Sequence, residues 1–509
     1  MRRLAEVLLA CLLLSACGEP KDAAGWAKRA VQRARTDEKL QALDQVRRAP
    51  GDRHAAVPWL VEVLRQGPRV RAEAAIALGE FGDPAAVGPL LTAVEPEARD
   101  RETQDANRQI AVALGALRAR EAIPVLARLT GSPDGFTQVA AVDALGQIGD
   151  PAGVEPLVAV ATSQAVEPFT ARKALLALGR IGDPRAAPVV LRLLFEQRGG
   201  ASLYSEAAFA ASQIGPPMAP LLLAVLEGKD AEVLEHARAQ GIAPGAVQAK
   251  VVVLLGLVGG TEAVPPLVAR LSYRDPDPEL ERWVRRFAAT ALGALRAREA
   301  VKPLGEVVTR ATDQDLRDRA CEALALIGDP AALPALRAVA TGTWTRRAAP
   351  LAALSRLGGP ADQPLVEAAA RSCPEPCPAG QAEALAGMRE RLAAAATCGD
   401  VRCWAGKLGD ASAAVRDRAA LEVGRGGSGA DAAALVEAAE RPVDGDATLA
   451  VRTHAVLAVG WIAARGPVPD GPALADRLER VIAQERGRTL TAAVNEEAFA
   501  VATRLRRGR

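Results

Sequence analysis

The sequence predicts an all-α fold, an α-solenoid (superhelix) of about thirteen helical hairpins. Three observations predict it: a repeat of about 35 residues, a recurring motif for the corner between two helices, and a composition suited to closely packed helices. Hydrophobic residues make up 50% of the 509 residues, yet aromatic residues make up only 3%. This mixture favours helices packed through Ala and Leu over a core built on large rings.

The repeat is visible in a Leu-Gly or similar pair that ends one helical run in each copy. Successive pairs lie about 35 residues apart. A hydrophobic-Arg pair precedes several of them at a constant distance, as at Val70-Arg71 and Val284-Arg285, which supports the same register. The reference residues, one per repeat, are Leu43, Leu78, Leu114, Leu145, Leu178, Ala211, Leu255, Leu292, Leu324, Leu354, Ala386, Val423 and Val459.

The corner motif is Gly-Asp-Pro. Gly suits the left-handed position that ends one helix, Asp caps the next helix, and Pro fits its first position, where no N–H is needed. A second Pro follows four or five residues later and is expected to kink or fray the start of that helix. The four corners begin at Gly82, Gly149, Gly182 and Gly328, and the second prolines are Pro89, Pro156, Pro188 and Pro334.

This pattern resembles the HEAT-repeat family, in particular the shorter HEAT-like repeats named after phycobilisome lyases. The resemblance covers residues 30–465 and implies two antiparallel helices per repeat, with the second helices lining a concave side. The family also tends to place an Asp six residues before the Arg, which Asp410/Arg416 matches. The wider spacing after Ala211 predicts an insertion near 227–245. Residues 360–410 read as a degenerate repeat containing cysteines, and 466–509 as C-terminal capping helices.

The first residues predict export. Arg2 and Arg3 precede an apolar run, and Leu14-Ser15-Ala16-Cys17 then resembles the lipobox of bacterial lipoproteins. That resemblance implies removal of 1–16, lipidation of Cys17, and a tether over 17–29. The alternatives are an ordinary signal peptide or a chance apolar start. No later stretch has the ~20 uninterrupted apolar residues of a membrane span. We therefore expect an anchored protein of the cell envelope. Residue 18 is Gly rather than Asp, and the resemblance to enterobacterial lipoprotein sorting then implies the periplasmic face of the outer membrane.

Four cysteines are candidates for disulfides or for a zinc site, or they are free thiols. Their spacing departs from the tighter spacing of zinc ribbons, and disulfides are the ordinary fate of paired cysteines outside the cytoplasm. Residues 380–396 read as one helix of ~25 Å, whereas a disulfide needs Cα atoms within about 7 Å. We therefore predict two local bridges, Cys373–Cys377 and Cys398–Cys403, with Cys321 as a small buried core residue.

The motifs of catalysis are weak. The segment Gly424–Gly429 fits a dinucleotide fingerprint by letter, but it follows a repeat helix and reads as a degenerate corner. His54, His236 and His454 lie in distant repeats, and none is followed by Glu, unlike the repeated His-Glu pairs of the iron-binding HEAT-repeat hydroxylases that this architecture resembles. We expect no enzyme activity, no metal and no cofactor.

The partner surface is expected on the concave face. Residues five before and two after each reference position share a helix face, since they lie seven apart. This face changes from Glu73 and Glu80 in an early repeat to basic or aromatic residues in late repeats. The alternative is a solvated helix face. Trp and Arg are favoured at protein interfaces, so the expected partner-binding residues are Arg418, Arg425, His454 and Trp461.

These features predict a monomeric scaffold or adaptor that binds an unknown protein or peptide. Two alternatives remain open: a pigment-lyase-like enzyme or lyase chaperone, as the named repeats suggest, and a structural spacer or assembly factor of an envelope complex. Lys plus Arg total 63 and Asp plus Glu total 61, so the basic excess needed for nucleic-acid binding is absent. The membrane is expected to be reached through the N-terminal lipid alone.

Overall fold

The computed structural model describes residues 20–484 and 492–507. The chain divides into two compact units, Met1–Val189 with Arg198–Ala210, and Val190–Gln197 with Ala211–Arg509. The predicted signal peptide and Cys17 lie outside the described residues.

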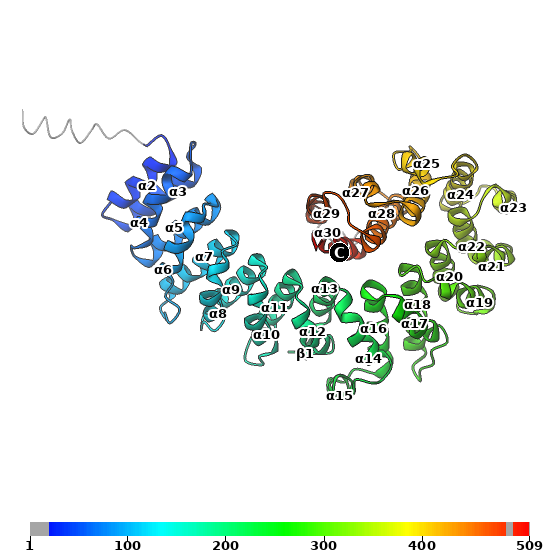
Figure 1. The fold of residues 1–509 in the computed structure, drawn as a ribbon, viewed down its shortest axis with the longest axis horizontal. Helices are drawn as coiled ribbons and strands as arrows, with labels where there is room; N and C mark the ends of the chain where they lie inside the picture. Colours follow the sequence, from blue (N-terminus) through cyan, green and yellow to red (C-terminus); the bar gives the residue numbers. More distant parts are fainter. Residues whose placement is uncertain (1–19, 485–491, 508–509) are drawn as a thin grey trace, which may run out of the picture. The chain divides into compact units, whose positions relative to one another are not determined.

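A short helix and a longer helix alternate along the first unit, and successive pairs lie side by side (Figure 1). Its helices are α2 (Ala23–Gln32), α3 (Thr36–Arg48), α4 (Val57–Leu64), α5 (Pro68–Phe81), α6 (Val87–Ala93), α7 (Arg101–Ala116), α8 (Ile123–Leu129), α9 (Gly135–Ile148), α10 (Val154–Thr162) and α11 (Pro168–Ile181). The boundary between the units falls within α12 (Ala187–Leu193) and α13 (Tyr204–Ile214).

The second unit continues the alternation. Its helices are α14 (Ala219–Leu226), α15 (Ala231–Ala239), α16 (Pro244–Val258), α17 (Val264–Arg270), α18 (Pro278–Ala294), α19 (Val301–Arg310), α20 (Gln314–Ile327), α21 (Leu333–Val339), α22 (Trp344–Leu357), α23 (Gln363–Arg371), α24 (Ala379–Thr397), α25 (Val401–Lys407), α26 (Ala413–Gly426), α27 (Ala432–Glu440), α28 (Asp446–Arg465), α29 (Gly471–Gln484) and α30 (Ala492–Arg507).

The predicted fold class is confirmed. The described residues form thirteen helix pairs from α2–α3 to α27–α28, and α29–α30 follow as a further pair. Each reference residue of the sequence repeat lies in a longer helix, and all except Ala386 are buried. In α24 Ala386 is exposed, whereas Leu385 and Leu392 are among the buried residues, so the reference residue chosen for this repeat does not face the core. The long, Ala-rich α24 offers several equivalent small residues, which explains the error.

The corners form as their residues dictate. Gly149 has φ 71° and ends α9, Asp150 accepts a hydrogen bond from the Ala152 N–H at 2.9 Å, and Pro151 follows. The predicted kink at the second Pro is wrong, because the corner first makes a 3₁₀ turn, Pro151–Gly153, and α10 then begins at Val154. Pro156 therefore lies in the first turn of an α-helix, where its missing N–H costs nothing.

The Gly of the Leu-Gly pair permits close packing of neighbouring repeats. A Cβ atom added to Gly146 of α9 would lie 2.8 Å from the Cβ atom and 3.0 Å from the Cα atom of Ala177 in α11. The same contact joins Gly79 to Ala113 in the preceding repeats. Since real Cβ atoms do not approach so closely, glycine lets the longer helices touch backbone to backbone.

The Arg of the second sequence marker caps the short helices. Arg285 Nε donates to the Leu271 carbonyl at 3.0 Å, where α17 ends, and Arg452 Nη2 donates to the Arg441 carbonyl at 2.6 Å, where α27 ends. Cations are favourable at these carbonyls because the helix dipole is negative there. Arg416 donates to the backbone carbonyl of Asp410 at 2.7 Å, so this Asp-Arg pair contacts through main chain.

Three segments depart from the simple alternation. Residues 227–245, where we expected an insertion, contain the additional helix α15. Between α12 and α13, β1 (Gln197–Arg198) and β2 (Ala201–Ser202) form a two-stranded sheet, which the all-α prediction missed because both strands lie in a connecting loop. By length and composition α28 would be able to cross a membrane, but 56% of that stretch is buried. Its residues Ala455, Val459 and Ile462 belong to a hydrophobic core cluster.

Candidate functional site

The two predicted disulfides are present. Cys373 and Cys377 have Cα atoms 5.4 Å apart, and so do Cys398 and Cys403. Helix α24 separates the two pairs, as the sequence argument required. Cys321 is a buried free cysteine, and burial raises the pKa of its thiol to about 12. The described residues contain no group of three or more potential metal-binding side chains.

One of the predicted partner-binding residues, His454, is buried against the carboxylate of Asp417. His454 is 4% exposed and its Nδ1 atom contacts Asp417 Oδ1. On the other oxygen, Asp417 accepts hydrogen bonds from Arg356 Nε at 2.9 Å and Arg391 Nε at 3.0 Å. Burial by itself would raise the pKa of Asp417, but Arg356, Arg391 and His454 hold it well below its usual range. Asp417 is therefore an ionised carboxylate that joins three helices.

Arg418 is also buried, against the end of an earlier helix. Its Nη1 atom donates to the Ser355 carbonyl and its Nη2 atom to the Gly358 carbonyl, both at 2.8 Å, where α22 ends. The guanidinium lies 5.2 Å from the centre of the Trp404 ring. Burial lowers the pKa of Arg418 to about 10. We expected an exposed contact residue, and the structure corrects this for Arg418 and His454, because both side chains are bonded inside the fold.

Arg425 and Trp461 contact the ends of two further helices. Arg425 Nη2 donates to the Ala325 carbonyl in the last turn of α20, and Trp461 Nε1 donates to the Ala294 carbonyl at 3.1 Å, at the end of α18. The guanidinium of Arg296 stacks on the Trp461 ring, 4.9 Å from the ring centre. Donors from α26 and α28 thus cap three successive longer helices, α18, α20 and α22 (Figure 1).

This arrangement closes the second unit on itself. Thr503 of α30 also donates to the side chain of Gln213, at the start of the unit. The late basic and aromatic side chains therefore bond to the unit's own middle repeats, whereas we expected them to face a partner protein. We call this set of contacts the clasp, formed by Arg418, Arg425 and Trp461.

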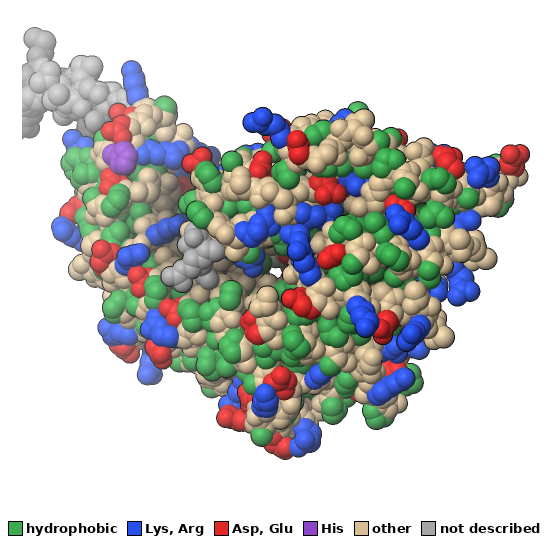
Figure 2. All heavy atoms as spheres, turned by 45° about the vertical axis from the view of Figure 1, so that its right-hand side comes forward, with side chains coloured by type: hydrophobic (Ala, Val, Ile, Leu, Met, Phe, Trp, Pro, Cys, Tyr) green, Lys and Arg blue, Asp and Glu red, His purple; other side chains and the backbone are tan. Residues whose placement is uncertain are grey.

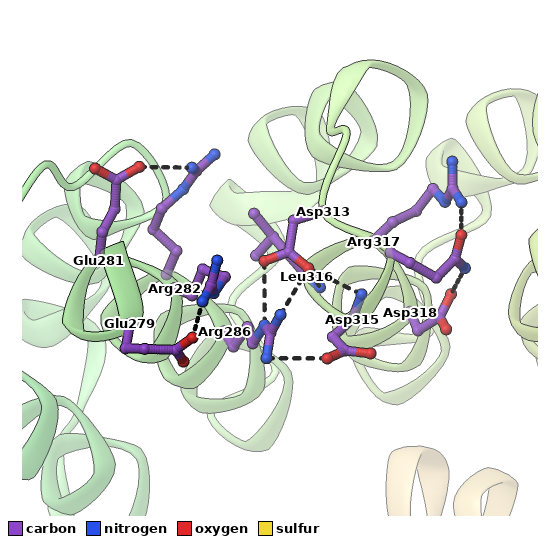
Figure 3. A network of polar contacts seen from close by, with 11 residues as sticks. Glu279, Glu281, Arg282, Arg286, Asp313, Asp315, Leu316, Arg317 and Asp318 are labelled. Atoms are coloured by element: carbon purple, nitrogen blue, oxygen red, sulfur yellow. Dashed lines mark hydrogen bonds and ion pairs between the residues drawn. The ribbon is translucent and has the colours of Figure 1, made fainter. Parts of the chain in front are cut away.

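Between neighbouring repeats of the second unit, ion pairs hold the longer helices in register. Arg286 of α18 contacts both carboxylate oxygens of Asp313, at 3.1 and 2.8 Å, and also reaches Asp315 at 2.9 Å (Figure 3). Asp313 at the same time caps α20. Burial would raise the pKa of Asp313, but hydrogen bonds from Arg286 and the α20 backbone bring it below the ordinary value. Arg286 is therefore a structural link between repeats.

The first unit carries an exposed apolar row that the sequence analysis missed. Val112 on α7 is 49% exposed, Phe136 on α9 is 71% exposed, and Phe169 on α11 is 60% exposed. Arg108 lies 5.9 Å from the Phe136 ring centre and Lys173 lies 5.8 Å from the Phe169 ring centre. Each phenylalanine is the second residue of a longer helix. Large exposed apolar side chains on adjacent helices are typical of a binding surface.

A signal for this row exists in the sequence. Phe136 and Phe169 each lie nine residues before a reference position, one helical turn before the positions on which the partner prediction was based. Trp283 of α18, at 46% exposure, has the same position in its own repeat. Rings are rare in this chain, so an aromatic residue that recurs at one repeat position would have indicated the surface.

The remaining sequence candidates lie apart from these surfaces. The glycine-rich segment is a corner, as predicted. Helix α26 ends at Gly426, and Ser428 directly precedes a 3₁₀ turn, Gly429–Asp431. The Ser428 N–H donates to Asp431 Oδ2 at 2.8 Å. His54 contacts Asp83 at 2.8 Å in the first unit, and His236 contacts Glu196 at 3.0 Å in the second. The three histidines do not come together.

Comparisons with known proteins agree with the geometry. A model described as HEAT repeats matches residues 93–169, 281–355 and 302–386, and the PBS lyase HEAT-like repeat matches 70–95 and 170–196. A search of curated proteins finds no match.

Solved structures match this chain at low sequence identity and with low TM-scores. Human deoxyhypusine hydroxylase in complex with glycerol is 21% identical over 53% of this chain and 95% of its own, with a TM-score of 0.22. The complex of CpcE and CpcF of phycocyanin lyase from Nostoc sp. PCC7120 is 20% identical over 55% and 92%, with a TM-score of 0.26. Karyopherin Kap121p, bound to the C-terminus of the protein phosphatase Cdc14p, is 10% identical over 94% and 64%, with a TM-score of 0.43.

These three likenesses concern the fold alone and assign no activity. The repeat models match in both units, and the matched segments lie in the helix pairs described above. Both units of the chain therefore contain HEAT-type repeats.

Proposed function

We propose that this protein is a membrane-anchored HEAT-repeat scaffold that binds another protein in the cell envelope. A HEAT-repeat solenoid is suited to protein–protein interaction, because stacked helix pairs present an extended surface. The observation that carries the proposal is the exposed row of Val112, Phe136 and Phe169. In water these side chains leave apolar area uncovered, and a partner that covers them gains that area as binding free energy.

The neighbouring charges make the row suitable for a protein rather than a small molecule. Asp143 pairs with Lys173 at 3.0 Å and with Arg180 at 3.5 Å, so the polar rim is already neutralised within the unit. An apolar centre with a polar rim is the usual anatomy of a protein interface. The phenylalanine rings supply rigid contact area at low entropic cost, because only two side-chain torsions have to be fixed in each.

A site-specific crosslinking experiment tests the row. A photo-crosslinking amino acid replaces Phe136 or Phe169 in cells, and Trp59, which is exposed on the short helix α4, serves as the matched control position. We expect one discrete adduct from positions 136 and 169, and none from position 59. The replacement Phe136→Ser with Phe169→Ser is then expected to lower partner recovery about tenfold, with the melting temperature unchanged. Equal adducts at all three positions contradict the proposed interface.

The anchor is a separate part of the proposal. Cys17, at the end of the lipobox-like Leu14-Ser15-Ala16-Cys17, would carry the lipid and the following residues would tether the first unit to the outer membrane. Two acyl signals give stable membrane attachment. We expect Cys17→Ser to move the protein from the membrane fraction to the soluble periplasmic fraction, with Cys321→Ser as the control that leaves it on the membrane. Retention of the Cys17→Ser protein on membranes excludes the anchor.

Two alternatives are distinguished by simple observations. The match to the PBS lyase HEAT-like repeat favours a pigment-lyase-like enzyme or lyase chaperone, which would co-purify with a visible chromophore. A spacer or assembly factor of an envelope complex would show its loss in the assembly of that complex, without a partner crosslinked to Phe136. The scaffold reading has the exposed row in its favour, and we therefore prefer it.

A further inference from the structure

A cluster of four arginines lies where the clasp meets the end of α18. Arg296 and Arg298 come from the turn between α18 and α19, Arg425 from the last turn of α26, and Arg465 from the end of α28. We call these residues the arginine cluster. Figure 2 shows that Lys and Arg side chains also gather beside a hollow near the middle of the face it draws.

The arginine cluster is poorly balanced by acidic groups. The charged residues with the largest effects on the pKa of Arg296 are the basic Arg425, Arg465 and Arg298 and the acidic Glu422. Glu422 is already shared, since its Oε1 atom lies 3.1 Å from Arg425 Nη1 and 3.6 Å from Arg418 Nε. The cluster therefore has an excess of positive charge.

Two of the cluster's N–H groups are left without a partner. The buried Nε atoms of Arg296 and Arg425 make no hydrogen bond to any residue that the structure describes. The Arg425 side chain is 10% exposed, and its guanidinium packs against Gly328, where a Cβ atom would lie 2.3 Å from Nε. An unpaired buried donor on a cation is costly, so this region gains free energy when an anionic acceptor arrives.

The pKa of Arg296 reports the same imbalance. Burial, followed by repulsion from Arg425, Arg465 and Arg298, lowers the pKa of Arg296 to about 10. Trp461 covers one face of the guanidinium, while Arg298 and Arg465 are exposed. An approaching ligand thus meets two exposed cations first and a preorganised, partly desolvated cation behind them.

We propose that the arginine cluster is a docking site for an acidic peptide segment of a partner protein, whose carboxylates pair with Arg296, Arg298 and Arg465. Arginine favours carboxylates because its planar group donates two parallel hydrogen bonds. Several arginines spread over three helix ends fit several carboxylates on one chain, rather than a single small ion. With 63 basic against 61 acidic residues, the whole chain lacks the net basic excess that non-specific nucleic-acid binding needs.

Fluorescence anisotropy of a labelled hexaglutamate peptide tests the proposal on the full exported chain. The test variant carries Arg298→Gln and Arg465→Gln, and the matched control carries Arg310→Gln and Arg402→Gln, two exposed arginines of the same unit. Both variants lose the same net charge. We expect the test variant to bind about tenfold more weakly than the control, and the wild-type affinity to fall steeply with salt.

Arg465 also donates to the Gly427 carbonyl at 2.9 Å, so the single variant Arg298→Gln, which removes an exposed side chain, is measured beside the double variant. Thermal unfolding checks that each variant is folded. Equal affinity of test and control variants overturns the proposal. So does a labelled oligonucleotide of equal charge that binds as tightly as the peptide, since the cluster would then be a general polyanion site.

The arginine cluster and the exposed row lie in different units and their tests are independent. The Phe136→Ser with Phe169→Ser protein is expected to bind hexaglutamate as the wild type does. Loss of crosslinking at Phe136 would leave the cluster standing, and loss of peptide binding would leave the row standing.

Discussion

Asp417 is the buried carboxylate that pairs with three side chains of the second unit. It is fully buried and contacts Arg356, Arg391 and His454, which come from α22, α24 and α28. A buried carboxylate with three cationic or donor partners tolerates no removal, because each partner would then keep an uncompensated charge or an unused donor inside the fold. His454 and Arg418 are candidates from the sequence, whereas no sequence pattern indicates the role of Asp417.

We predict that Asp417→Asn, which preserves volume, destabilises the second unit by about 3–5 kcal/mol at pH 7. Urea unfolding followed by circular dichroism measures the effect. Asp143→Asn, at a carboxylate of the first unit that is 24% exposed, is the control and is expected to change stability by less than about 1 kcal/mol. A loss of equal size in both variants contradicts the role given to Asp417.

The same residue predicts a pH dependence. The pKa of Asp417 in the folded protein lies well below its ordinary value, so its ionised form is favoured by folding. This stabilisation is fully present above the unfolded pKa, about 4, and is lost as the pH falls through the folded pKa. We expect the wild type to lose stability below about pH 4, and Asp417→Asn to show a flatter profile there. Parallel profiles for the two proteins contradict this assignment.

At the scale of helices, the contact of glycine with alanine sets how closely repeats approach. Gly146 permits α9 and α11 to touch at Ala177. In the sequence the Leu-Gly pair marks the repeat, but it does not show that the glycine permits close helix packing, because the partner Ala lies in the next repeat. The Gly-Asp-Pro corners, in contrast, were predicted correctly, since cap, turn and helix start lie within four neighbouring residues.

We predict that Gly146→Ala destabilises the first unit by about 1–3 kcal/mol, because the added methyl group forces α9 and α11 apart. Gly88→Ala in α6, where an added Cβ atom meets nothing within 4 Å, is the matched control. It is expected to be neutral or to stabilise by about 0.5–1 kcal/mol, because alanine is the better helix former. Thermal and urea unfolding compare them, and a stabilised Gly146→Ala protein would show that the close approach is not required.

At the scale of the whole molecule, each unit is a stack in which a repeat contacts its neighbours, and the second unit adds the clasp. Trp461 reaches Ala294 across 167 sequence positions, and Arg425 reaches the carbonyl of Ala325. Nearest-neighbour stacking alone does not produce such contacts. The clasp therefore couples the middle repeats to the last repeats of the same unit.

We predict that Trp461→Ala raises amide hydrogen exchange in the last turn of α18 and in the turn that carries Arg296, while overall helix content stays the same. Trp283→Ala, at an exposed position on the same helix α18, is the control that leaves exchange there unchanged. Hydrogen-exchange mass spectrometry measures both. Protection in these segments that is unaltered by loss of Trp461 would mean that the clasp does not hold the unit closed.

The sequence by itself determined the helix pairs, their corners and the two disulfides, because each depends on residues that are neighbours in the chain or separated by a single helix. The tertiary structure decided which side chains of the late helices are buried by contacts with earlier repeats. Small rotations between successive repeats add up over many pairs, and only their sum brings Trp461 to Ala294 and buries Arg418 against the end of α22. The residues of a single repeat do not reveal this accumulated rotation, so the sequence pattern could not predict these contacts.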